Sequence, residues 1–71
     1  MKRYEIKIGA EYRSQSQRGG RPMVINIPAG TVGEKHDHHG SEVIFPSLKR
    51  NGHMPFVWWS RFGKHLEEVP D

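Results

Sequence analysis

The chain contains no cysteine among its 71 residues. This absence excludes disulfide bonds and thiolate metal ligands, so apolar packing, a partner or histidine-bound metal must hold the fold. Long apolar runs are also missing, whereas a membrane-spanning helix needs about 20 apolar residues. The N-terminus, MKRYEIKIGA, has no apolar segment of the signal-peptide kind. We therefore expect a soluble, cytoplasmic protein without a membrane partner.

A helical period of convincing length is missing too, and short alternating stretches take its place. In KRYEIKI, Tyr4, Ile6 and Ile8 point to one side and charged residues to the other, which predicts a half-buried strand. Four more strands are expected in residues 23–27, 31–36, 41–46 and 53–59. Residues 60–69 begin as a short turn or 3₁₀ segment and end in the apolar pair Leu66 and Val69.

Glycine and proline mark the connections between these strands. Residues 9–22, GAEYRSQSQRGGRP, have no apolar repeat and predict a long flexible loop. A turn over residues 37–40 needs a positive φ at Gly40, and it would place Lys35 opposite Glu42. Asn51-Gly52 is the strongest hairpin signal, because a type I′ turn needs positive φ at both positions. That turn would place Phe45 opposite Trp58.

Short strands joined by turns predict an all-β fold, a small closed or half-closed barrel of about five strands. IPAGTVGEKHDHHGSEVIFP followed by FVWWSRFGKHLEEV resembles the SH3-like small barrels of phage and bacterial accessory proteins. The resemblance implies a strand ending in a Pro-Ala-Gly-Thr turn, a hairpin, a tryptophan-bearing strand, a short turn and a terminal Leu-Glu-x-Val strand. A single domain over residues 1–71 is expected. Residues 23–69 would form its barrel core, and residues 1–22 an N-terminal strand extension and flexible basic loop.

Charge is unevenly distributed, although the net charge is only +3. Residues 1–21 carry six Lys or Arg against two Glu, and residues 49–65 carry four Lys or Arg and no acid. The C-terminal residues are acidic. This pattern predicts a surface with one basic side, and an evenly solvated surface explains it equally well.

The stretch WWSRFGK raises the question of which aromatic side chains are buried. Alternation along a strand sends Trp58 and Trp59 to opposite faces, so one indole fills the core and the other lies outside or at an interface. An uncovered ring beside Arg61 and Lys64 suits base stacking or a protein-binding hot spot. Full burial of both indoles under the N-terminal strand is the alternative.

The cluster His36-Asp37-His38-His39 has metal-ligand chemistry but only a compositional signal. Without cysteine, further zinc ligands would have to be His53, His65 or an acid folded nearby. An exposed hairpin turn is the simpler interpretation, and no metal or cofactor is predicted. No serine or threonine lies in a nucleophile motif, so we do not expect an enzyme.

These features favour a non-enzymatic binding module. The first hypothesis is a basic small barrel, encoded by a phage or mobile element, that contacts nucleic acid or the machinery bound to it. The alternative is an inhibitor or adaptor that docks on an acidic host protein. Either partner would meet the same ten residues: Arg13, Arg18, Arg21, Lys49, Arg50, Trp58, Trp59, Arg61, Phe62 and Lys64.

Overall fold

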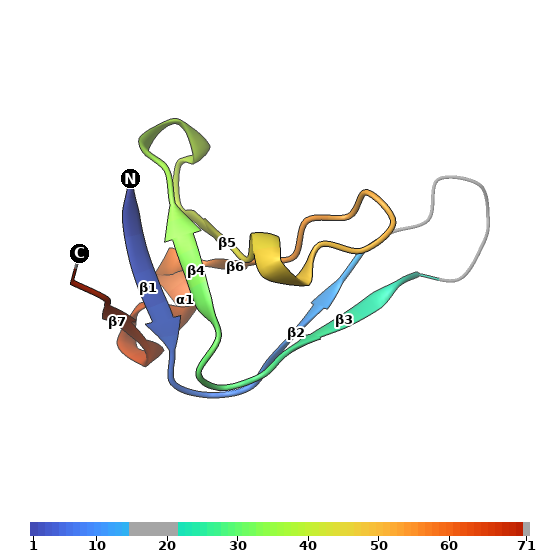
Figure 1. The fold of residues 1–71 in the computed structure, drawn as a ribbon, viewed down its shortest axis with the longest axis horizontal. Helices are drawn as coiled ribbons and strands as arrows, with labels where there is room; N and C mark the ends of the chain where they lie inside the picture. The colour runs from blue at the N-terminus through green and yellow to red at the C-terminus, as the bar shows by residue number, and fades with distance from the viewer. Residues whose placement is uncertain (15–21, 71) are drawn as a thin grey trace.

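The structure is a computed structural model that describes residues 1–14 and 22–70. Its described part forms two sheets: a five-stranded sheet in the order β6-β5-β4-β1-β7 and a two-stranded sheet of β2 and β3 (Figure 1). The strands are β1 Lys2–Ile6, β2 Ala10–Arg13, β3 Val24–Ile27, β4 Val32–Lys35, β5 Glu42–Ile44, β6 Phe56–Trp58 and β7 Leu66–Glu68. Short helical segments are η1 Asp37–His39, η2 Pro46–Leu48, α1 Trp59–Phe62 and η3 Gly63–His65. The predicted β character is confirmed, but the sheets do not close into a barrel in the described residues.

The N-terminal half of the fold is one long hairpin that contributes to both sheets. β1 pairs with β4, and β2 pairs with β3, both antiparallel. Lys2 faces Lys35 in the first ladder, and Ala10 faces Ile27 in the second. These pairs belong to a single register, because each step forward on one arm matches one step back on the other. No residue is inserted or lost where the hairpin bends.

The ladder is locally irregular at the bend. The Ile6 N–H donates to the Thr31 carbonyl at 3.0 Å, but the Gly30 N–H, one residue before Thr31, donates to the Ile6 carbonyl at 2.7 Å. Gly30 has a φ of 95°, which a side chain would disfavour. The prediction of a loop over residues 9–22 is therefore wrong for residues 10–13, which continue the N-terminal strand as β2.

The sequence predicted that the N-terminal strand is an extension of the fold, but β1 is an internal strand of the five-stranded sheet. β1 lies between β4 and β7 in the five-stranded sheet and buries Tyr4 and Ile6. Lys7, just beyond β1, lies 3.2 Å from Glu67 of β7. The hydrogen bond to Glu67, with the charges of Glu5 and Glu67, raises the pKa of Lys7 above its ordinary value of 10.5. This pairing therefore stabilises the fold at neutral pH and is lost only as alkaline pH deprotonates Lys7.

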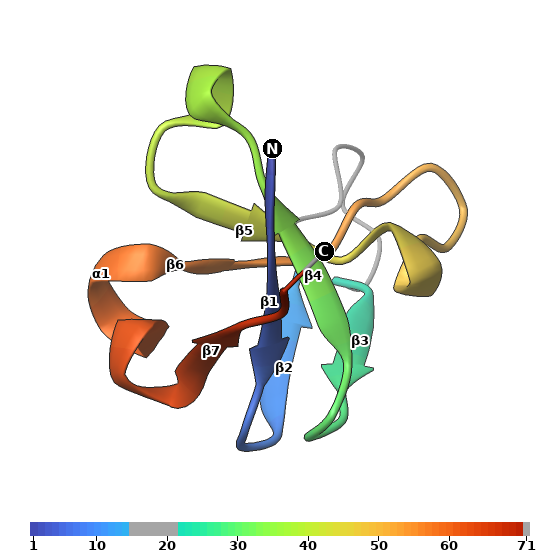
Figure 2. The same cartoon turned by 60° about the vertical axis from the view of Figure 1, so that its left-hand side comes forward.

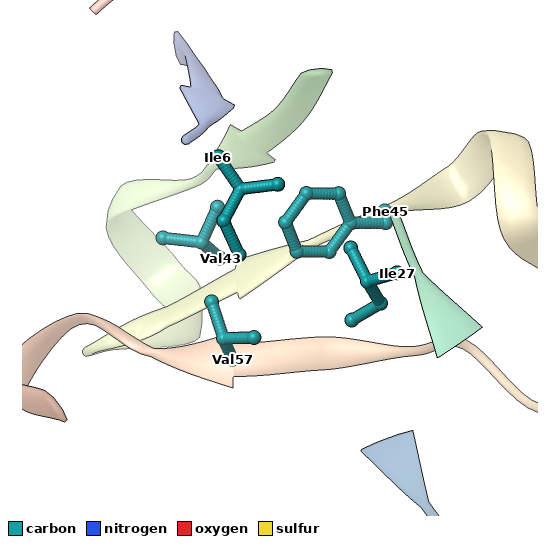
Figure 3. Close-up of a cluster of buried hydrophobic side chains, with 5 residues drawn as sticks. All are labelled: Ile6, Ile27, Val43, Phe45 and Val57. Carbon is teal, nitrogen blue, oxygen red and sulfur yellow. The ribbon is translucent and has the colours of Figure 1, made fainter. Parts of the chain in front are cut away.

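Side chains from both sheets share one core. Ile6, Ile27, Val43, Phe45 and Val57 are between 0% and 4% exposed and form one cluster (Figure 3). Ile27 comes from the two-stranded sheet, and the others come from the five-stranded sheet or its immediate continuation. The alternation of apolar residues predicted from the sequence is what brings these side chains to the same side.

The Asn51-Gly52 turn forms as predicted, but the strands on either side of it do not pair as expected. Asn51 has a φ of 49° and Gly52 a φ of 79°, and a bridge joins the residues that flank them. The β5–β6 ladder pairs Ile44 with Phe56, so the predicted pair of Phe45 with Trp58 does not form. The reason is η2, whose three residues add a 3₁₀ turn to one side of the hairpin only.

The turn after β4 shows a smaller shift of the same kind. Gly40 has the expected positive φ, at 66°. The ladder between β4 and β5 pairs Glu34 with Ile44, which puts Lys35 opposite Val43. The predicted pair of Lys35 with Glu42 is therefore wrong by one residue, because the turn takes up one residue more than the four expected.

The last predicted strand of the hairpin ends earlier than residues 53–59 suggest. β6 stops at Trp58, and α1 begins at Trp59.

In the part of the chain that the structure describes, no helix has the length and apolar character needed to cross a membrane.

The close packing of Gly33 against the core gives a direct test of this fold. A Cβ at Gly33 would lie 2.7 Å from the Ile44 carbonyl oxygen and 2.8 Å from Cε1 of Phe45. We expect Gly33→Ala to lower the free energy of unfolding by about 1–3 kcal/mol through overpacking. Gly9→Ala is the matched control, since the nearest atom to its Cβ is 3.9 Å away, and its effect should stay within about 0.5 kcal/mol. Urea denaturation of both variants measures this, and equal stabilities would contradict the packing described.

Candidate binding groove

A groove lies where the two-stranded sheet meets β6 and α1. It has a volume of about 290 Å³. The groove is lined by three consecutive residues of β2, by the three residues of β6 and by two residues of α1. The lining residues are Glu11, Tyr12, Arg13, Phe56, Val57, Trp58, Arg61 and Phe62, and we call this site the β2–β6 groove.

Three aromatic side chains form a continuous row in the β2–β6 groove. The ring centroids of Tyr12 and Phe56 lie 5.2 Å apart. Those of Phe56 and Trp58 lie 5.1 Å apart with the rings at 86°, an edge-to-face contact that aromatic pairs favour. Alternation along β6 explains the arrangement, because Val57 points into the core and its two neighbours point away from it. Trp58 remains 44% exposed at the end of the row.

The two adjacent tryptophans have different roles, as the sequence predicts. Trp59 is the first residue of α1, where the chain leaves the strand. Its ring lies 4.8 Å from that of Tyr4, and its side chain packs against the core. Phe62 also packs on the core from one end of the groove. Trp58 is thus the uncovered indole, and the alternative in which both indoles are buried is wrong.

The charge in the β2–β6 groove is nearly balanced. Arg13 and Arg61 are its cations, and Glu11 is its acid. Arg13 Nη2 lies 3.2 Å from Glu11 Oε1, an exposed pair that adds little stability but offsets the charge. Arg61 has no ion-pair partner among residues 1–14 and 22–70. The groove therefore presents one paired and one available guanidinium.

A second hollow adjoins the groove and shares two of its aromatic residues. It has a volume of about 390 Å³ and is lined by Tyr12 and Phe56 together with Glu42, Ile44, Gly52, His53 and Met54. Glu42 adds a second acid to this side of the molecule. The continuous surface thus combines aromatic and apolar side chains with charges of both signs.

Only part of the predicted binding set meets in the β2–β6 groove. The structure brings Arg13, Trp58, Arg61 and Phe62 together there. The others are distributed as follows: Trp59 lies against the core, Lys49 and Arg50 follow η2 on the hairpin, Lys64 is in η3, and Arg18 and Arg21 fall outside the described residues. The predicted single basic side is therefore not what defines this site.

Sequence reasoning missed Glu11, Tyr12 and Phe56 as site residues. The alternation in AEYR, with Ala10 and Tyr12 on one side, was the available signal for β2. It was hidden because the stretch is short and continues into a polar, glycine-rich segment. Phe56 was assigned to a strand, but its contact with Tyr12 depends on long-range packing that no local pattern reveals.

Alternate residues of β6 turn their backbone N–H and C=O groups away from β5. Hydrogen bonds join Phe45 N–H to the Pro55 carbonyl at 2.9 Å and Trp59 N–H to the Ser41 carbonyl at 2.6 Å. In an antiparallel ladder, every second residue bonds to the neighbouring strand. Phe56 lies one step from Pro55, so its backbone groups point away from β5, as do those of Trp58.

The same alternation applies to β2. The Ser14 N–H donates to the Met23 carbonyl at 2.9 Å, so the even-numbered residues of β2 bond to β3. Glu11 and Arg13 therefore turn their N–H and C=O groups to the other edge, beside the groove. No ladder joins β2 to β6 within the described ranges, and Figure 2 shows β6 running across the direction of β2.

The described side chains of the histidine cluster, which do not include that of His39, make local contacts. His36 Nε2 lies 3.0 Å from Glu34 Oε1, and the rings of His36 and His38 meet edge to face at 5.5 Å. Among the residues described, no group of three His, Cys, Asp or Glu side chains is placed to hold a metal ion. The interaction with Glu34 gives His36 a structural contact at the start of the turn.

The different burial of the two tryptophans can be tested with paired variants. We expect Trp59→Ala to cost about 2 kcal/mol or more of unfolding free energy, approaching the roughly 3–5 kcal/mol of a fully buried aromatic. Trp58→Ala should cost less than about 1 kcal/mol, because its side chain lies outside the core and is 44% exposed. Chemical denaturation gives both values, and acrylamide quenching should report mainly Trp58. A larger loss for Trp58→Ala than for Trp59→Ala would contradict the assignment.

Comparison with known proteins does not assign this chain to a family. No protein-family model, curated protein or solved structure is significantly similar to the chain. The function therefore has to be argued from the β2–β6 groove itself.

Proposed function

We propose that this protein is a non-enzymatic docking module that binds another protein through the β2–β6 groove. The observation that carries the proposal is the exposed Trp58, which lies at the end of an aromatic row in the same groove as Arg61. Tryptophan and arginine are enriched among the few residues that contribute most of the binding energy of protein interfaces. The half-buried Tyr12 and Phe56 provide the apolar floor that such an anchor needs.

The balance of charge favours a protein over a nucleic acid. Phosphate binding depends on lysines and arginines that neutralise the backbone without competing acids. In the groove, Arg13 is paired with Glu11, and Glu42 lines the adjoining hollow. The available Arg61 suits a single carboxylate of a protein partner, which makes an acidic surface the best fit. This corresponds to the adaptor or inhibitor alternative from the sequence.

Single-strand nucleic acid binding is the second candidate. It is supported by the row of Tyr12, Phe56 and Trp58, because bases stack on exposed aromatic side chains. The guanidinium of Arg61 beside Trp58 would add a phosphate contact. Lys49 and Arg50, both exposed on the hairpin, would have to extend the contact beyond the groove.

We also propose that the fold is a half-closed relative of the SH3-like small barrels found in phage accessory proteins. The order of elements supports this. β3 leads through the Pro28-Ala29-Gly30-Thr31 turn to the β4–β5 hairpin, and β6 carries Trp58. The short segments α1 and η3 then precede the terminal strand β7. The open seam between β2 and β6 lies where a closed barrel would continue.

The salt dependence of binding to oligo-dT and oligo-rU separates the two candidate functions. For single strands, the slope of log affinity against log salt is about −0.7 per phosphate contact, so two groove arginines give about −1.4 and the seven cations of the predicted set give about −5. The docking proposal predicts weak binding with a slope of about −1.4 or shallower. Tight binding with a slope near −5 would instead support the nucleic-acid candidate.

Site-specific photo-cross-linking tests the docking proposal directly. A photoreactive phenylalanine analogue replaces Trp58 in one variant and Val32 in a matched control, since Val32 is similarly exposed at 40% but lies on β4. With a lysate of cells that express the protein, position 58 should give discrete protein adducts that position 32 does not. Identical adducts from both positions, or nucleic-acid adducts alone at position 58, would contradict the proposal.

A further inference from the structure

We infer that the outer edge of β2 takes up an extended segment of the partner protein as an added antiparallel strand. The inference rests on the docking function proposed above and specifies how the partner binds. Two features of the structure support it. One is the pattern of backbone hydrogen bonds along the long hairpin, and the other is the set of side chains that line the β2–β6 groove beside β2.

One edge of the hairpin is paired with β7 along β1 and has no hydrogen-bonded strand along β2 among the described residues. The Val69 N–H donates to the Arg3 carbonyl at 2.9 Å, and the Lys7 N–H donates to the His65 carbonyl at 2.7 Å. Odd-numbered residues of this arm therefore face β7. In β2 the Ser14 N–H donates to the Met23 carbonyl, so the odd-numbered residues of β2 again turn away from the partner arm, beyond the end of β7.

Glu11 and Arg13 are the residues exposed in this way. Their N–H and C=O groups point from β2 toward the β2–β6 groove, while Tyr12 between them bonds to β3. A strand added here would continue the line of β7 and extend the two-stranded sheet to three strands. Two-stranded ribbons gain stability from a third strand, so the addition also stabilises the receiving sheet. Peptides bind sheet edges in this way, with main-chain hydrogen bonds supplying much of the affinity.

The walls of the groove define the chemistry of the added segment. Side chains of a strand alternate, so every second residue of the segment would face Tyr12 and the aromatic row that includes Phe56 and Trp58. Those residues should be apolar or aromatic. At the α1 end, Arg61 has no ion-pair partner among the described residues and suits a carboxylate. The occupant is therefore an extended segment with alternating apolar residues and at least one Asp or Glu.

The two edge strands of the five-stranded sheet, β7 and β6, are less suitable for strand addition than β2. β7 has three residues, and two of them, Glu67 and Glu68, are exposed acids. Short, charged edge strands discourage pairing with other chains. β6 is also three residues long and passes at once into α1. The edge of β2 has four residues and directly adjoins an aromatic hollow.

A displayed library of short random peptides, selected on the full chain, provides the probe. We expect enriched peptides to alternate apolar residues with at least one acid. Amide hydrogen exchange, followed by NMR, should then slow by about tenfold or more at Glu11 and Arg13 when the selected peptide is saturating. Tyr12, whose amide already bonds to β3, should change much less. Side-chain contact alone would not slow amide exchange at Glu11 and Arg13 while leaving Tyr12 nearly unchanged.

Backbone N-methylation of the selected peptide is a control that leaves the protein unchanged. Methylation should abolish binding at every second peptide position and be tolerated at the positions between, because a paired strand uses alternate N–H groups. In the protein, Arg13→Pro should weaken binding more than Arg13→Ala, since both remove the guanidinium but only proline removes the N–H. Circular dichroism checks that each variant is folded.

Several outcomes would overturn the inference. Failure of the library to yield any enriched peptide is one, and slowed exchange confined to Phe56 and Trp58 or to β7 is another. A dimer formed by the free protein in light scattering, with the Glu11 and Arg13 amides protected by a second copy, would assign the edge to self-association. Peptides that bind in the groove without slowing these amides would refute strand addition and leave the docking function standing.

Discussion

The rest of the structure depends on the register that the two ladders of the long bent hairpin share. The Lys2–Lys35 and Ala10–Ile27 pairs share one register on the two sides of an irregular bend, so in both ladders the parity of each residue decides which edge its backbone faces. The same parity brings Tyr4 and Ile6 to the core in the large sheet and Tyr12 toward the aromatic row in the small one. A one-residue slip in either half would exchange core and surface side chains.

The core and the groove are two consequences of the same seam between the sheets. Phe45 and Ile27 fill the space between the sheets on the inside, where Gly33 permits close approach to Phe45. On the outside, β2 and β6 come together without bonding, since they run in different directions (Figure 2). Side chains that cannot enter the core, chiefly Trp58, are left at this seam beside backbone groups that have no strand to pair with.

Local patterns in the sequence predicted the β character, most of the strands and the two glycine turns with positive φ. Four residues of the predicted binding set, Arg13, Trp58, Arg61 and Phe62, line the β2–β6 groove, and the patterns left open which indole is exposed. They did not predict β2, because four alternating residues lack weight against a polar, glycine-rich continuation. They also missed the shift of the β5–β6 ladder, since the 3₁₀ turn of η2 depends on how Pro46 to Leu48 pack against the fold. The pairing of Arg13 with Glu11, which lowers the net charge of the groove, was not predicted because it depends on the strand they share.

The most direct test of this account is amide hydrogen exchange in the free protein. The account predicts slow exchange for Lys7, bonded to His65, and for Tyr12, bonded within the hairpin. It predicts fast exchange, close to that of an unstructured chain, for Glu11 and Arg13, which share the edge of Lys7 but lie beyond the end of β7. Protection of Glu11 and Arg13 equal to that of Lys7 would show that the edge is already covered, and it would contradict the central claim.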